Sequence, residues 1–235
     1  MELHYDERGS GPAVLVVHAM GADAAAWEPA LDELAAAGLR AIAFDRRGYG
    51  ASGAPEPYAA TTVQEQAQDA GALLQALDAA PAVLVGDGFG ALVVLELLVR
   101  RPGLARGAVL VDPLVHAFVP EATKALAAER EVLEEALREG GRAAAVLAWL
   151  GDRVDPARAA RAAANHAGFF ADYAGQSSWS PSRRELRAIG VPVVVVTGPA
   201  TPGHVAAAAD AVAGLVPGAR RAGNGDVVGA VVALS

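Results

Sequence analysis

Uninterrupted apolar runs recur along the chain and alternate with segments in which apolar residues return every three or four positions. The runs predict strands buried on both faces, and the spaced segments predict helices with one apolar face. We expect strands at residues 13–18, 40–44, 82–85, 108–111, 191–197 and 219–222. We expect a first helix that Asp23 caps, that carries Trp27, Leu31 and Leu34 and that ends near Gly38. Further helices are expected at 61–79, 89–101 and about 202–215, and from Asp226 onward. This alternation indicates an α/β fold with a doubly wound, mostly parallel sheet.

The middle of the chain departs from that rhythm, because residues 114–190 contain no strong strand candidate. Helical spacing instead appears at 121–139 and 143–150, followed by an alanine-rich stretch from Pro156 and an aromatic segment. We expect a small helical lid here, inserted over the carboxyl ends of the strands. Residues 1–113 and 191–235 then form the core of what is a single domain overall, as 235 residues allow.

The composition limits which partners and which cellular compartment we expect for the protein. The chain has 19 basic and 27 acidic residues, a net charge of −8 that argues against nucleic acid as a partner. Cysteine is absent, which excludes disulfides, thiolate metal sites and cysteine nucleophiles. The first residues are polar and acidic, unlike a signal peptide, and no apolar run approaches the roughly 20 residues that cross a membrane. We therefore expect a soluble, cytoplasmic protein that does not engage membranes.

The turn from Gly86 to Gly90 joins a buried strand to an apolar helix and has the form of a nucleophile elbow. In the G-x-S-x-G version of that motif, the central serine is lifted above the sheet by a strained turn. The central residue here is Gly88. The turn is therefore present without its nucleophile.

Four motifs occur in the order typical of one family. They are His18-Ala19-Met20-Gly21, similar to an H-G-x-G oxyanion loop; Asp45 to Ser52, which matches D-x-R-G-x-G-x-S; the elbow; and the strand from Val191 to Gly198. On these residues the chain resembles the α/β-hydrolase fold superfamily, in particular small lid-bearing bacterial hydrolases. The resemblance covers nearly the whole chain, with the lid least specific, and implies the doubly wound sheet already expected.

The resemblance also implies a Ser, acid and His triad, supplied in that order by successive strand ends. Gly88 stands at the serine position, and no serine occurs between Ser52 and Ser177. Residues 198–202 hold no carboxylate, and residues 223–226 read Gly-Asn-Gly-Asp where the family has its histidine. We therefore expect a degenerate triad and no Ser-His-acid hydrolysis.

The oxyanion hole survives these losses, because its donors are main-chain N–H groups. The resemblance assigns them to Phe89 and to Ala19 or Met20, beside Gly88. Such donors stabilise any oxyanion or enolate. They suit proton transfer, elimination, cyclisation or ligand holding.

Five side chains are candidates for an acid or base: His18, Asp87, Asp112, His116 and His204. Asp87 precedes the lost serine position, one residue too early for an aspartate nucleophile, and a hydrogen-bonded structural role is its alternative. In relatives the residue at the position of His18 often supports the oxyanion loop. Some relatives place an alternative acid at the strand end that Asp112 occupies, but family members commonly keep a structural Asp-Pro there. His116 stands at the start of the lid, and His204 is either near the lost acid position or a cap of the following helix.

Six aromatic residues could line an apolar ligand cavity, although such spacings also suit lid packing. They are Trp27, Trp149, Phe169, Phe170, Tyr173 and Trp179. The histidines are too scattered for a metal cluster, and the elbow fails the G-x-G-x-x-G pattern of dinucleotide sites. We expect no metal and no cofactor.

Three functions remain. The leading one is a non-hydrolytic or divergent enzyme that acts on an apolar carbonyl-containing small molecule, in specialised metabolism. The alternative is a pseudoenzyme that binds a ligand or a partner protein without turnover. The weaker alternative is an esterase-type hydrolase with an unconventional nucleophile.

Overall fold

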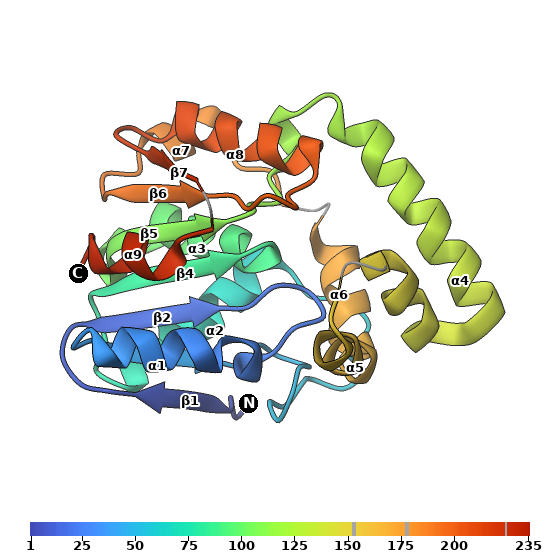
Figure 1. The fold of residues 1–235 in the computed structure, drawn as a ribbon, viewed down its shortest axis with the longest axis horizontal. Helices are drawn as coiled ribbons and strands as arrows, with labels where there is room; N and C mark the ends of the chain where they lie inside the picture. The colour runs from blue at the N-terminus through green and yellow to red at the C-terminus, as the bar shows by residue number, and fades with distance from the viewer. Residues whose placement is uncertain (152–153, 177–178, 224) are drawn as a thin grey trace.

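The computed structural model describes residues 1–151, 154–176, 179–223 and 225–235. Its centre is a seven-stranded sheet with the order β1-β3-β2-β4-β5-β6-β7 (Figure 1). The strands are β1 (Tyr5–Arg8), β2 (Ala13–Val17), β3 (Arg40–Phe44), β4 (Ala82–Asp87), β5 (Ala105–Val111), β6 (Val193–Val196) and β7 (Arg220–Ala222). All neighbours pair in parallel except β1, which is antiparallel to β3. The expected doubly wound, mostly parallel sheet is confirmed.

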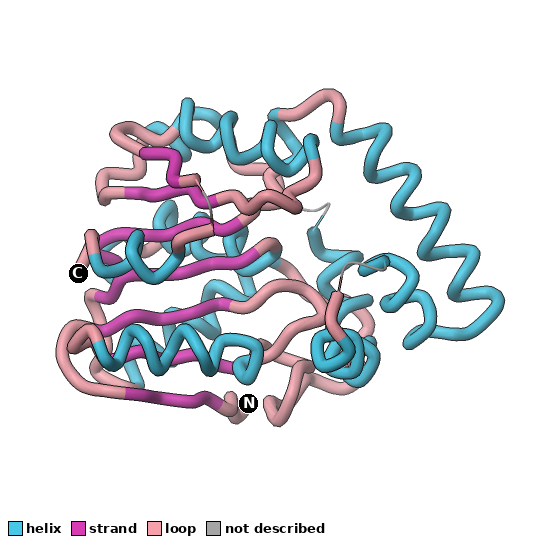
Figure 2. The backbone as a smooth tube through the Cα atoms, in the orientation of Figure 1, coloured by secondary structure: helices cyan, strands magenta, loops and turns pink. Residues whose placement is uncertain are grey.

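Helices cover both faces of this sheet, as Figure 2 shows by colour. They are α1 (Glu28–Ala36), α2 (Val63–Ala76), α3 (Phe89–Arg100), α4 (Ala122–Leu150), α5 (Pro156–Ala164), α6 (His166–Gln176), α7 (Arg183–Arg187), α8 (Gly203–Leu215) and α9 (Val227–Val232). The 3-10 turns η1 (Ala24–Trp27), η2 (Pro102–Leu104) and η3 (His116–Phe118) lie between them. Helices α1 and α9 pack on one face, and α2, α3, α7 and α8 pack on the other.

Successive residues of the central strands point to opposite faces and bury both. In β4, Leu84 joins the core beneath α2 and α3, whereas Val83 and Val85 join the core beneath α1 and α9. All three are fully buried. A strand buried on both faces must be apolar throughout, which is why the uninterrupted runs located the strands so closely.

Helices α4, α5 and α6 follow β5 in the chain and lie beyond the carboxyl ends of the strands (Figure 1). Helix α6 is nearest to the sheet and α4 is outermost. The two helical stretches expected at 121–139 and 143–150 form the single element α4, which is interrupted at Gly141 by non-helical backbone (φ 77°, ψ −172°). Glycine adopts this positive φ at little steric cost, so Gly141 allows the bend.

Two local features differ from the sequence expectation. Strand β1 was not expected, because it is a partly exposed edge strand with polar side chains and makes its main-chain pairing with Phe44 and its neighbours. Asp23 precedes η1 but makes no capping hydrogen bond. The Ala24 N–H instead donates to Asp45 Oδ1 at 2.8 Å, so a distant carboxylate takes the role that we expected of Asp23.

No helix in the described part of the chain combines the length and the apolar character that a membrane crossing requires.

Candidate active site

The turn between β4 and α3 has the geometry of an elbow. Gly88 occupies it with φ 55° and ψ −111°, a conformation that few side-chain-bearing residues adopt. A Cβ on Gly86 would lie 2.5 Å from Gly90 O, and a Cβ on Gly90 would overlap the carbonyl oxygen of Val17. These two glycines therefore let α3 start in direct contact with β2 and β4. Gly88 itself has room, because its Cβ would meet Ala19 Cβ at 3.4 Å.

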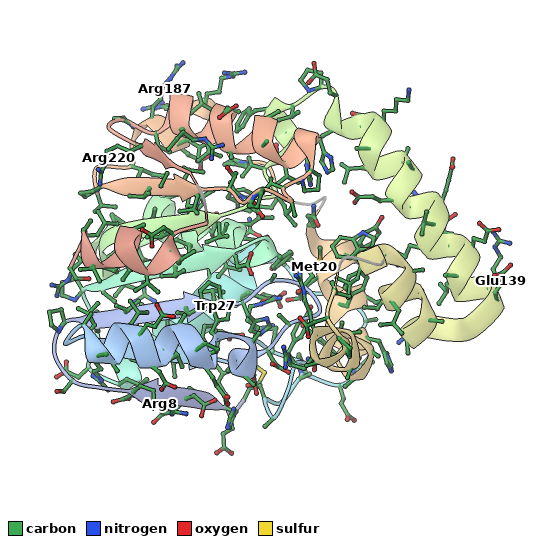
Figure 3. All side chains as sticks on the ribbon, viewed as in Figure 1. Arg8, Met20, Trp27, Glu139, Arg187 and Arg220 are labelled. Carbon is green, nitrogen blue, oxygen red and sulfur yellow. The ribbon has the colours of Figure 1, made fainter. Side chains whose placement is uncertain are left out.

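A cavity of about 900 Å³ opens above this elbow, at the carboxyl ends of the strands. Its floor includes Ala19, Met20, Gly88 and Phe89. Much of the remaining wall is apolar and comes from the segment after β5, from α4, from the link between α4 and α5, and from α8: Leu114, Leu126, Trp149, Leu150, Val154 and Val205. Figure 3 shows Met20 between the ends of the strands and helices α4, α5 and α6. The oxyanion loop and the elbow thus contribute residues to the same cavity.

Main-chain N–H groups on the cavity floor are available to a ligand. Within the described ranges, the N–H groups of Ala19, Met20 and Phe89 make no hydrogen bond to the protein. Phe89 is the first residue of α3, and the first N–H groups of a helix have no acceptor within it. The floor therefore presents donors of the kind that stabilise a developing oxyanion.

Asp87 is the carboxyl group at the end of β4, beside Gly88, and it lines the cavity. Its side chain makes no hydrogen bond within the described part of the chain. Burial raises the pKa of Asp87 from its ordinary 3.8 to about 6, and nearby Asp112 adds to the rise, whereas Arg158 and Arg46 oppose it. A partner-free carboxyl with a pKa near neutrality is suited to exchange protons with a ligand.

Asp112 directly follows β5, and Val111 at the end of that strand pairs with Asp87. Asp112 has a positive φ of 43°, which is unusual for a residue with a side chain. Thr201 Oγ1 donates to Asp112 Oδ1 at 2.7 Å and accepts the Gly198 N–H at 2.9 Å. Burial raises the pKa of Asp112, and the bond from Thr201 opposes the rise. Asp112 thus lines the cavity with a partner that Asp87 lacks.

His116 and His204 lie together on another part of the cavity wall, with ring centroids 5.7 Å apart. His204 Nε2 is 3.5 Å from Glu129 Oε1 of α4. Burial and the neighbouring His204 lower the pKa of His116 to about 4, so its ring is neutral at physiological pH. The fold brings both histidines to the cavity, although no distance places them beside Asp87.

His18 is buried away from the cavity and does not line it. Its Nδ1–H donates to Ala19 O at 2.8 Å, and its Nε2 accepts the Arg46 N–H at 3.0 Å. Burial and the Arg46 charge keep the pKa of His18 well below its usual range. With both nitrogens occupied, His18 supports the oxyanion loop, and its position does not favour the acid or base role.

The aromatic candidates separate into two groups. Trp149, Tyr173 and Trp179 line the cavity. Phe169 and Phe170 do not line it; Phe169 packs behind Trp149, with ring centroids 5.1 Å apart. Trp27, the last residue of η1, is partly buried against the core on the face covered by α1 and α9, and it does not line the cavity in which we expected it.

Several polar residues of the wall were not among the sequence candidates, and Glu129, Arg158 and Thr201 are three of them. Each comes from an element that the insertion or the last strands bring to the site, so no local motif marks it. Thr201 lies in the loop after β6, the segment that we singled out for its lack of a carboxylate. Asn224, in the segment expected to have lost the histidine, and Ser177 lie outside the described residues.

Metal binding has no support within residues 1–151, 154–176, 179–223 and 225–235. No three histidine or carboxylate side chains there are arranged to hold an ion. The donors on the cavity floor are instead neutral main-chain N–H groups, which suit an anionic or carbonyl oxygen.

Comparison with known proteins supports one family. The profile of the alpha/beta hydrolase fold family matches residues 12–145. Among curated relatives, a putative non-heme bromoperoxidase of Mycobacterium tuberculosis is 39% identical over 111 residues, which is 47% of this chain and 41% of that protein. An epoxide hydrolase of Caballeronia sordidicola is 40% identical over 102 residues, which is 43% of this chain and 31% of that protein. The matches thus cover less than half of these relatives' length.

Solved structures extend the likeness over the whole chain. An alpha/beta hydrolase of Sphaerobacter thermophilus superposes with a TM-score of 0.75 at 22% identity, covering 99% of this chain and 95% of that one. A bromoperoxidase of Bacillus anthracis gives a TM-score of 0.77 at 20% identity, covering 94% and 86%. At these identities the likeness shows the fold alone.

Proposed function

Because the chain belongs to the alpha/beta hydrolase fold family, we propose that it uses the cavity of that fold for proton transfer, without a covalent intermediate. The substrate is an apolar small molecule with a carbonyl group. Helices α4, α5 and α6 serve as the lid over it. The observation that carries the proposal is Asp87, a partner-free carboxyl with a pKa of about 6 in the same cavity as the N–H groups of Met20 and Phe89.

The residues at two of the three triad positions support chemistry other than acyl transfer. Gly88 has no side chain with which to attack a carbonyl. The loop after β6 offers Thr201 where the family acid stands, and its hydroxyl is already bonded to Asp112. Without a nucleophile at Gly88, a carbonyl bound at the elbow is held by the oxyanion donors, and Asp87 is the carboxyl group beside them.

The proposed reaction begins with the substrate oxygen between the N–H groups of Phe89 and Met20. Asp87 then takes a proton from the carbon next to the carbonyl. The electron pair of the broken C–H bond forms the C=C bond of an enolate, and the negative charge moves to the oxygen. Each well-placed oxyanion donor lowers such a barrier by about 2.7 to 4 kcal/mol. Asp87 then returns a proton to the same carbon, which gives exchange or epimerisation. Alternatively, the enolate re-forms the carbonyl and expels a group from the next carbon with its bonding electron pair, which gives elimination, and Asp87 releases its proton to that group or to solvent.

Deuterium incorporation tests the proposal without knowledge of the product. The protein is incubated in D₂O with apolar ketones and esters, and NMR measures exchange at the carbon beside the carbonyl. Because Asp87 acts as a base only when ionised, the exchange rate should rise with pH through about 6 and level off above it. A catalysed rate that is unchanged between pH 5 and 7 would exclude Asp87 as the base.

Binding without turnover is the second candidate, and the same free N–H groups and cavity favour it. Saturable binding of a carbonyl compound without deuterium exchange or any other conversion would replace the enzymatic proposal with this one.

Restoring the serine separates the proposal from residual esterase activity. In Gly88→Ser the new Cβ meets only ordinary contacts, but the backbone at φ 55° costs on the order of 1 to 3 kcal/mol with a side chain. We expect a lower melting temperature and no gain in hydrolysis of p-nitrophenyl esters, because residues 223–226 hold no histidine where the family places the one that activates serine. Steady turnover of these esters by the variant would show that a base for serine is present after all.

A further inference from the structure

Arg46 lies in the core directly below the oxyanion loop, and its side chain is only 1% exposed. Its Nε–H donates to His18 O at 3.0 Å, and its Nη2–H donates to Ala19 O at 3.2 Å. In a trans peptide unit the C=O of one residue and the N–H of the next point in opposite directions. The guanidinium therefore turns the N–H groups of Ala19 and Met20 away from itself. These are the two N–H groups that the loop offers to the cavity.

Helix α6 supplies the charge that keeps Arg46 in this place. Asp172, which is fully buried on α6, accepts Arg46 Nη2–H at 2.7 Å. The Tyr49 hydroxyl and Gln66 Nε2 also donate to Asp172, each at 2.5 Å, and Arg46 Nη1 donates to Gln66 Oε1 at 2.6 Å. An unpaired buried guanidinium is strongly unfavourable, so Arg46 stays beneath the loop only while α6 presents its carboxylate.

The face of α6 around Asp172 is built for close approach. Gly168, Asp172 and Gly175 are spaced i, i+4 and i+7, which places them on one side of the helix. A Cβ on Gly168 would lie 2.6 Å from the Tyr49 ring and 2.8 Å from Gly48 O, and a Cβ on Gly175 would overlap Thr61 O. Helix α6 is thus in close contact with the segment after β3. Tyr173, the residue after Asp172 on the same helix, lines the cavity.

We infer that Arg46 and Asp172 are positioning residues through which α6 holds the oxyanion N–H groups of Ala19 and Met20 in their orientation. The inference rests on the proposed function for its catalytic consequence. Its structural part stands apart from that function, because it concerns the order of the loop in the unliganded protein. Helix α6 is then a fixed support for the donors of the oxyanion loop.

The test compares the full-length wild type with Arg46→Met, with the double variant Arg46→Met/Asp172→Asn and with a control, Asp69→Asn. The double variant removes both buried charges together, so it remains informative where the single variant fails to fold. The control breaks the neighbouring Arg47–Asp69 ion pair (2.6 Å), which makes no contact with the loop carbonyls. Backbone ¹⁵N relaxation reports the order parameters of the Ala19 and Met20 amides.

We expect order parameters of about 0.85 in the wild type and the control, and below about 0.6 at Ala19 and Met20 in both Arg46 variants. Unchanged values in the Arg46 variants would overturn the inference, even where proton transfer itself is detected. With an identified substrate, kcat for deuterium exchange should fall about 10² to 10³-fold in the double variant, with KM changed less than about threefold. An equal fall in kcat for Asp69→Asn would also overturn the inference. A mobile loop without any turnover would uphold the positioning role and count against the proposed function alone.

Discussion

Replacing Asp87 by asparagine should lower the rate of deuterium exchange by about 10² to 10⁴-fold, the usual contribution of a positioned general base. Asparagine keeps the shape of the side chain but cannot take a proton between pH 5 and 8. Because Asp87 makes no hydrogen bond in the described structure, the substitution leaves no protein donor or acceptor without a partner. The loss should therefore fall on kcat and leave ligand binding largely intact, as measured by titration calorimetry.

The same variant should be more stable than the wild type at high pH. A carboxyl whose pKa is raised from 3.8 to about 6 is harder to ionise in the folded protein than in the unfolded chain. Ionisation of Asp87 therefore lowers the free energy of unfolding. This loss is absent well below pH 3.8, grows as the pH rises toward 6 and is complete above that value. After allowance for solvent in the cavity, the loss is about 2 kcal/mol. The melting temperature of Asp87→Asn should thus exceed that of the wild type by about 5 °C at pH 8 and match it near pH 3.5.

Asp32→Asn is the matched control, since it makes the same change at an exposed position of α1. It should alter neither the exchange rate nor the pH dependence of stability. If Asp87→Asn retains wild-type exchange, Asp87 is not the base. If its stability gain does not depend on pH, the raised pKa is not the cause.

The sequence located the sheet well because its central strands are buried on both faces. Burial on both sides leaves little choice but Val, Leu and Ala, so composition over a few residues identifies the strand. Strand β1 lacks this signal, because its side chains are partly exposed and its stability comes from pairing with β3. The interruption of α4 at Gly141 was visible as the gap between two helical stretches, but the course of the bend was not.

The sequence predicted only those residues of the candidate site that belong to a short continuous motif. The elbow and the oxyanion loop place Met20, Gly88 and Phe89 in the cavity by local backbone geometry. Residues such as Glu129 and Arg158 reach the cavity through the packing of inserted helices, which no local pattern encodes. Asp172 did leave a trace, as a lone carboxylate among the aromatic residues of α6, and a charge in such a place suggests a buried partner. That the partner is Arg46 depends on the tertiary fold.

Replacing Gly90 by alanine should destabilise the protein by on the order of 3 kcal/mol or more and lower its melting temperature by roughly 10 °C. The added Cβ would overlap Val17 O and would lie 2.7 Å from Val17 C and 2.8 Å from His18 O. These atoms belong to the backbone of β2 and of the oxyanion loop, so they cannot move aside as a flexible side chain would. The loss should appear although alanine is the better helix former by about 1 kcal/mol.

Gly103→Ala provides the control, because a Cβ at that exposed position meets nothing within 4 Å. Its melting temperature should stay within about 2 °C of the wild type. The contrast is informative about the site as well as about stability. If α3 must shift to admit the methyl group at Gly90, the N–H of Phe89 shifts with it, and the exchange rate of the folded variant should fall further than its stability requires. A Gly90→Ala protein with wild-type melting and exchange would mean that the close contact of α3 with β2 does not set the oxyanion geometry.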